Sequence, residues 1–156
     1  MIKQCKLVFD PIIKTLCPKP YYNHPKGCPN YGKKIGCPPD TPDINFILNL
    51  ARPVYVIYNK FNLLNHIHNM EILHPDWSDR QLYCCLYWQP RARKVLNEMI
   101  YNFLCLNKDY IVFRVPEAYG VNVTQTMRDI GEILEWPPIN FAYQVALAGI
   151  PIGEKK

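Results

Sequence analysis

Hydrophobic runs of two kinds alternate along the chain. Apolar and aromatic residues follow one another closely in four runs, QCKLVF (4–9), VYVIY (54–58), YIVFRV (110–115) and INFAYQVALAGI (139–150), which predicts strands. Helical spacing or helix-start signals mark five others, at 44–51, at 61–73, near Asp79, at 92–106 and at 123–130. The alternation predicts an α/β or α+β fold, a sandwich of about four strands with helices packed on them.

Capping residues refine several of these boundaries. Ser78 and Gln81 have the spacing of a capping box, so a helix should begin near Asp79. Pro90 then either kinks this helix or starts a second one. Asn122 can cap the helix over 123–130, and Gly131 can end it.

Residues 10–40 form a segment of another kind, rich in proline, glycine and lysine and poor in aliphatic residues. Such a segment has little to bury, so it needs a cross-link or a metal to hold one shape. The segment contains three cysteines, each followed by proline: Cys17, Cys28 and Cys37. The sequence therefore predicts a cysteine-rich, metal-binding loop within a single domain, 1–156.

The chain of 156 residues has 49% hydrophobic residues, is long enough for one core, and shows no signal peptide or membrane-spanning run. We therefore expect a cytoplasmic protein without membrane contact. Seven cysteines in a reducing compartment, an odd number, argue against a disulfide framework and for thiolate ligation or burial. Cys5 and Cys105 are expected to be buried.

The net charge of +5 is concentrated near the start, where seven lysines and one acid, Asp10, precede Cys37. This charge can offset thiolate charge, attract nucleic acid, or belong to a solvated loop. Aromatic residues beside basic ones suit stacking on a nucleotide or a single strand, with ordinary packing as the alternative; they are Tyr21, Tyr22, Tyr31, Tyr87 and Trp88. No Walker loop, G-x-G-x-x-G, nucleophile elbow or H-E-x-x-H is present.

The cysteine spacing bears on the type of metal. Ten residues separate Cys17 from Cys28 and eight separate Cys28 from Cys37, and no Cys-x-x-Cys occurs, which argues against a zinc ribbon. Three separated thiolates favour a 4Fe-4S iron-sulfur cluster, and zinc held by the three cysteines and His24 is the alternative. Redox-active thiols without metal are a third interpretation.

A fourth cluster ligand can come from Cys84, Cys85 or His24, or be absent. Adjacent helical residues point about 100° apart, so at most one of Cys84 and Cys85 can face the loop. An absent fourth ligand leaves an open iron, which can bind a small or nucleotide-like substrate. The two leading hypotheses are such an iron-sulfur protein or enzyme and a zinc-stabilised module that binds nucleic acid or another partner.

Two motifs, GCPNYGKKIGCPP near the start and PEAYGVNVTQTMRDIG near the end, resemble those of an uncharacterised family of small, cysteine-rich prokaryotic and phage proteins, described as predicted metal-binding. The resemblance runs from Cys17 to about Gly149. It implies that Cys17, Cys28 and Cys37 bind the metal, with three further residues nearby: Glu117, Gly120 and Asn122. Members carry a further cysteine group before the second motif, where this chain has only Cys105, so a single centre is expected here.

Overall fold

Four strands form one antiparallel sheet in the part of the chain that the structure describes. The structure, a computed structural model, describes residues 1–21 and 24–153. The strands are β1 (Ile2–Cys5), β2 (Val54–Asn62), β3 (Ile111–Phe113) and β4 (Phe141–Gly149), and their order in the sheet is β1-β2-β4-β3. This sheet, with helices packed on it, confirms the α+β fold.

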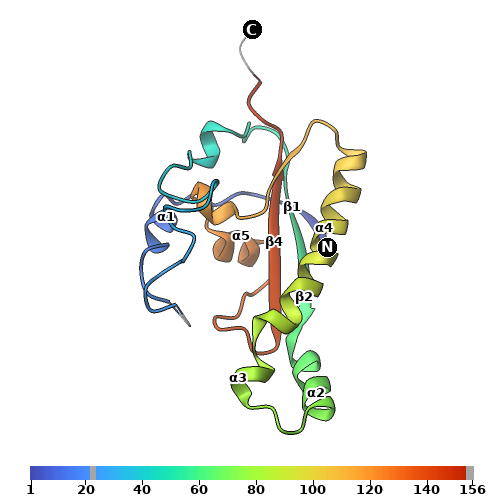
Figure 1. Ribbon diagram of the computed structural model, residues 1–156. Helices are drawn as coiled ribbons and strands as arrows, with labels where there is room; N and C mark the ends of the chain where they lie inside the picture. Colours follow the sequence, from blue (N-terminus) through green and yellow to red (C-terminus); the bar gives the residue numbers. More distant parts are fainter. Residues whose placement is uncertain (22–23, 154–156) are drawn as a thin grey trace.

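The remaining elements are short apart from two helices. They are α1 (Ile12–Leu16), η1 (Ile44–Phe46), α2 (Leu63–Leu73), α3 (Asp79–Leu82), α4 (Cys85–Leu106), η2 (Pro116–Tyr119) and α5 (Val123–Asp129). Figure 1 shows α4 on one side of the sheet and α1 and α5 on the other, with α2 and α3 near one end of it. The sheet therefore separates two layers.

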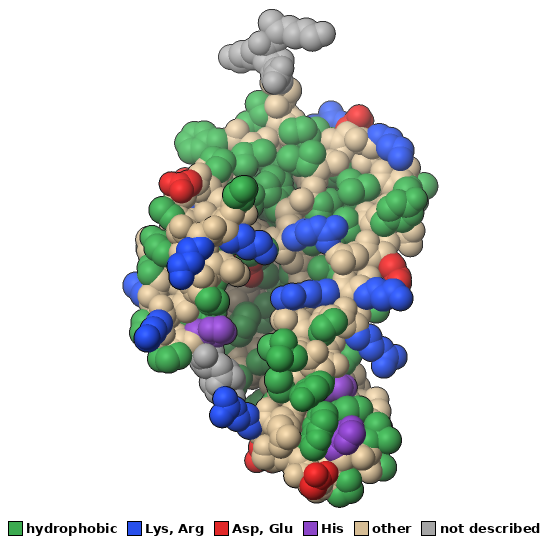
Figure 2. All heavy atoms as spheres, viewed as in Figure 1, with side chains coloured by type: hydrophobic (Ala, Val, Ile, Leu, Met, Phe, Trp, Pro, Cys, Tyr) green, Lys and Arg blue, Asp and Glu red, His purple; other side chains and the backbone are tan. Residues whose placement is uncertain are grey.

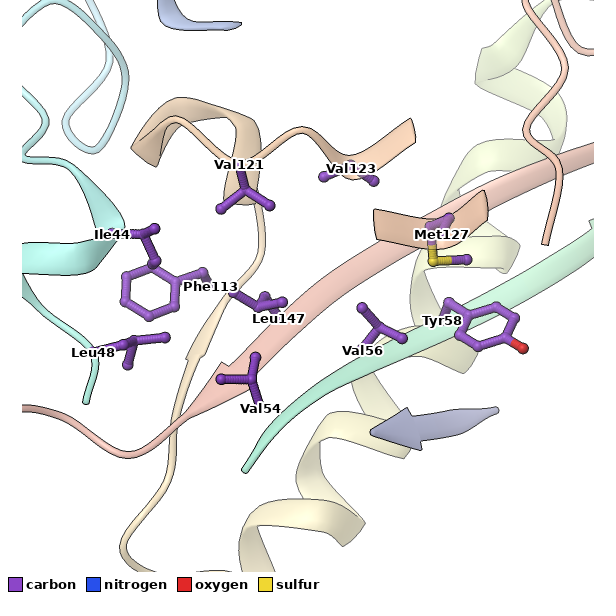
Figure 3. Packing of buried hydrophobic residues seen from close by; sticks show 10 residues of the cluster. All are labelled: Ile44, Leu48, Val54, Val56, Tyr58, Phe113, Val121, Val123, Met127 and Leu147. Carbon is purple, nitrogen blue, oxygen red and sulfur yellow. The ribbon is translucent and has the colours of Figure 1, made fainter. Parts of the chain in front are cut away.

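The layer that carries α5 contains the largest hydrophobic cluster. Side chains alternate along β2, so Val54, Val56 and Tyr58 all point into this layer. Figure 3 shows them with Leu147 of β4 below Val121, Val123 and Met127, and with Ile44, Leu48 and Phe113 beside them. Burial of these side chains fixes the segments around η1 and around η2.

The opposite face of the sheet is covered by α4. Leu96, Ile100 and Phe103 of this helix pack against Ile57 and two alanines of β4. Helical spacing over 92–106 predicts a helix with one apolar face, and this is confirmed except at its end, where Leu106 is exposed. The buried residues of this face are Ala92, Leu96, Ile100 and Phe103. Pro90 lies inside α4 and does not begin a second helix.

Several predicted boundaries need correction. The strand expected over 4–9 is β1, which ends at Cys5, and the helix expected over 44–51 is the single turn η1. That helix stops early because Leu48 forms a bridge with Pro151, and the Asn49 N–H donates to Ile150 O at 2.9 Å. The helix expected from residue 61 begins at Leu63, since β2 continues to Asn62.

The predicted caps are confirmed. The Asn122 side chain accepts a hydrogen bond from the Gln125 N–H at 2.9 Å at the start of α5. The Ser78 N–H donates to Gln81 Oε1 at 2.9 Å at the start of α3. Short polar side chains set these helix starts, as the sequence indicates.

Candidate metal centre

Cys17 and Cys28 are joined directly through the backbone. Cys17 follows α1, and its carbonyl accepts a hydrogen bond from the Cys28 N–H at 2.7 Å. Gly27 has a φ of +77°, and a Cβ there would lie 2.6 Å from the Pro18 carbonyl carbon. Only glycine fits this crossing, which brings together two cysteines that are eleven positions apart in the sequence.

The third cysteine lies in a tight turn of the same loop. The Cys37 N–H donates to Lys34 O at 3.0 Å, and the Gly32 N–H donates to Pro38 O at 2.9 Å. A Cβ on Gly36 would lie 3.7 Å from the Tyr119 hydroxyl, so this turn rests against η2. Cys17, Cys28 and Cys37 are all half-buried.

Glu117 of η2 lies within electrostatic reach of Cys17. Burial is the main cause that raises the pKa of the Cys17 thiol, and the charges of Cys28, Cys37 and Glu117 raise it further. Burial likewise raises the pKa of the Glu117 carboxyl. Cys28, Cys37 and Glu117 therefore each lie within electrostatic reach of Cys17, and we call these four residues the thiol site.

Backbone contacts from the start of the chain position Glu117. The Asp10 N–H donates to Gly120 O, and the Asn122 N–H donates to Val8 O, each at 2.8 Å. Gly120 has a φ of +81°, and a Cβ there would lie 2.7 Å from the Phe9 ring. The segment before the cysteine-rich loop is thus paired with the segment around η2, which lies about 110 positions later.

A further contact comes from the end of the loop. The buried Thr41 hydroxyl donates to Ala118 O at 2.5 Å. Lys14 of α1 donates to Asp43 Oδ1 at 2.8 Å and forms an ion pair with it. Both flanks of the loop are therefore attached to the structure around η2 and η1.

His24 lies beside Cys28. The His24 N–H donates to Tyr21 O at 2.8 Å, the Tyr21 N–H donates to His24 O at 3.1 Å, and their ring centres are 4.6 Å apart. His24 and Cys28 line the same pocket. Tyr22, a predicted stacking residue, lies outside the described residues.

The remaining predicted ligands lie elsewhere. Cys84 is the N-cap of α4 and half-buried, and Cys85 is exposed. Neither is among the groups that raise the pKa of Cys17, and Figure 1 shows α3, which directly precedes them, well apart from α1. The structure places these two cysteines in the helical region and not in the cysteine-rich loop.

The two cysteines that were expected to be buried, Cys5 and Cys105, differ in solvent exposure. Cys5 is half-buried in β1, where burial raises the pKa of its thiol to about 11. Cys105 is exposed in the last turn of α4, so the prediction of burial was wrong for it. Its position falls off the stripe of buried residues that ends with Phe103.

A carboxylate that no sequence motif marked also lies among polar side chains. Glu132 accepts hydrogen bonds from the Tyr58 hydroxyl at 2.7 Å, the Tyr143 hydroxyl at 2.9 Å and Lys3 Nζ at 3.2 Å. Lys60 Nζ lies 3.5 Å from Glu132 Oε2. We call these five residues the Glu132 cluster. Both oxygens of the Glu132 carboxylate have partners within this cluster, so the cluster serves to fix the chain after α5.

Within residues 1–21 and 24–153, no three or more His, Cys, Asp and Glu side chains are gathered as a set of metal ligands. This holds for the thiol site too, whose side chains would have to move closer together to bind one metal centre. None of the helices in these ranges combines the length and apolar character that a bilayer crossing requires. Comparison of the chain with protein-family models, with curated proteins and with solved structures found no match.

Proposed function

We propose that this protein holds an iron-sulfur cluster through Cys17, Cys28 and Cys37, with Glu117 at the edge of the cluster. The observation that carries the proposal is the thiol site itself, where two further half-buried cysteines and a carboxyl lie within electrostatic reach of the half-buried Cys17 thiol. In their ionised forms these groups repel, and burial raises the cost of each charge. A bound metal centre removes that cost, because thiolates and carboxylates are its natural ligands.

The distribution of the three cysteines favours a cluster over a single zinc ion. Each comes from a different turn of the loop, and no Cys-x-x-Cys is present to form a zinc knuckle. Cubane clusters take thiolates from well-separated positions. The N–H groups of Gly27 and Gly32 already donate to backbone carbonyls, so they do not serve as donors to cluster sulfides.

Three thiolates leave one corner of a cubane without a cysteine ligand. Glu117 lies within electrostatic reach of Cys17 and offers a carboxylate oxygen for that corner. An oxygen ligand exchanges more readily for substrate than a thiolate does, and an iron with an exchangeable position acts as a Lewis acid. On this basis we propose an enzyme site and not a purely structural cross-link.

Anaerobic purification, followed by iron, sulfide and zinc analysis, tests the proposal. We expect a brown protein with absorbance in the visible range and iron and sulfide in equal amounts. The variants Cys17→Ser, Cys28→Ser and Cys37→Ser should each lose the colour and most of the iron. Cys105→Ser is the matched control, since Cys105 is exposed at the end of α4, and it should keep both.

Two results would contradict the proposal in different ways. A colourless protein with one zinc per chain, lost in the same three variants, would keep the thiol site and reject the cluster. A protein that takes up neither metal, or one whose iron survives all three substitutions, would reject the site altogether.

A further inference from the structure

We infer that the pocket beside Cys28 binds a small molecule that carries a phosphate group, and this inference rests on the proposed function because that molecule would be the substrate. The pocket has a volume of about 470 Å³, within the range of small-ligand sites. Its lining includes His24, Lys26, Cys28, Tyr31 and Lys33. Cys28 belongs to both the pocket and the thiol site, so a molecule in the pocket would lie beside the proposed centre.

The charge of the pocket selects an anion. Lys26 and Lys33 line it, and none of its described lining residues is acidic. Neither lysine forms an ion pair with any of the described residues. Figure 2 shows Lys and Arg side chains at many places on one face of the molecule. An ammonium group on a flexible stem is a common phosphate ligand, and two of them suit a group with several anionic oxygens.

Several backbone N–H groups of the pocket are already engaged in hydrogen bonds. The Gly27, Cys28 and Lys33 N–H groups donate to His24 O, Cys17 O and Asn30 O at 3.0, 2.7 and 3.1 Å. A nest of free N–H groups, which many phosphate sites use, is therefore not formed by these residues. We therefore assign recognition of the phosphate to side chains, with the two lysines as the charged groups.

The rest of the ligand can contact rings. His24 and Tyr31 line the same pocket, and each presents a flat surface on which a planar base can stack. A nucleoside monophosphate has both a phosphate and such a base. It therefore serves as the probe for this class of ligand.

The experiment titrates the purified protein with adenosine 5′-monophosphate and with adenosine, by calorimetry at low salt, after its metal content has been measured. We expect the monophosphate to bind at least about tenfold more tightly than adenosine, since a lost charge-assisted contact costs that much or more. Lys26→Gln and Lys33→Gln should each weaken monophosphate binding about tenfold with unchanged metal content. Lys34→Gln is the matched control, because Lys34 is adjacent but does not line the pocket, and it should bind normally.

The outcomes separate this inference from the proposed function. Monophosphate binding that depends on both lysines, in a protein without metal, supports the pocket and rejects the centre. Equal affinities for adenosine and its monophosphate would overturn the inference that the pocket binds phosphate. A loss of metal in the lysine variants would overturn it too, because it would assign the lysines to charge balance at the metal centre. A single-stranded oligonucleotide that binds more tightly than the monophosphate, with Lys34→Gln equally impaired, overturns it as well, in favour of an extended nucleic-acid surface.

Discussion

Replacing Glu132 with glutamine should destabilise the protein at neutral pH much more than at acidic pH. The Glu132 side chain is 12% exposed. The hydrogen bond from Tyr58, together with those from Tyr143 and Lys3 and the charge of Lys60, lowers the pKa of its carboxyl from 4.5 to about 2, although burial opposes this. Because the carboxyl is more acidic in the folded chain than in the unfolded chain, its ionised form stabilises the fold.

The magnitude follows from the two pKa values. The interval from 4.5 to about 2, at about 1.4 kcal/mol per pH unit, is a stabilisation of about 3 kcal/mol. It is complete above pH 4.5 and is lost as the pH falls towards 2. Glu132→Gln should therefore reduce the free energy of unfolding by about 3 kcal/mol at pH 7 but by only about 1 kcal/mol at pH 3.

Urea unfolding at pH 7 and pH 3, followed by circular dichroism, measures this difference. Glu98→Gln is the control, because Glu98 is exposed on α4 and forms no ion pair with a described residue. It should change the free energy of unfolding by less than about 0.5 kcal/mol. An equal loss for Glu132→Gln at both pH values would refute the reasoning, since it would show that packing and not ionisation makes the Glu132 cluster important.

Two further substitutions test the loop and the core. An alanine in the left-handed region costs about 1–2 kcal/mol by its backbone conformation alone. Gly27→Ala should reduce the free energy of unfolding by more than this, because its Cβ would lie 2.6 Å from Pro18, whereas Gly32→Ala, with φ +65° and no atom within 4 Å, should cost only that amount. Equal losses for the two variants in urea unfolding would contradict the crossing of Cys17 and Cys28. Ala92→Leu should reduce the free energy of unfolding by about 1–3 kcal/mol in a thermal or urea melt, because Ala92 is a residue of α4 that is 0% exposed. Val95→Leu, at an exposed position of the same helix, should cost almost nothing. A neutral Ala92→Leu would show that α4 does not pack closely on the sheet.

The elements that the sequence predicted well are those whose signals are local. The β-branched and aromatic run after Pro53 and the mixed run near the end of the chain became β2 and β4, and the capping residues Ser78 and Asn122 stand at helix starts. Errors arose where two local signals overlapped. Residues 61 and 62 fit helical spacing but extend β2, because pairing with β4 continues as far as Asn62 and Phe141.

What the sequence could not supply depends on distant pairings. The place of β4 between β2 and β3 is fixed by side chains that meet only in the folded chain, such as Val56 opposite Leu147. The Glu132 cluster likewise joins residues up to 129 positions apart. No local pattern in the sequence distinguishes Glu132 from an exposed glutamate.

The thiol site also combines a local signal with a distant pairing. Its three cysteines were predictable from local composition, whereas the position of Glu117 depends on contacts between segments that are far apart in the sequence. Ile44 and Leu48 follow the loop, Val121 and Val123 follow η2, and all four enter one hydrophobic cluster. That cluster holds Glu117 and the ends of the loop in place through hydrophobic burial. Among described residues 17–40 the buried ones are only Gly27 and Pro38, so hydrophobic burial contributes little inside the loop. A metal centre would therefore order the interior of the loop against a carboxylate that the core has already positioned, which is the arrangement expected of a site built for binding and not only for cross-linking.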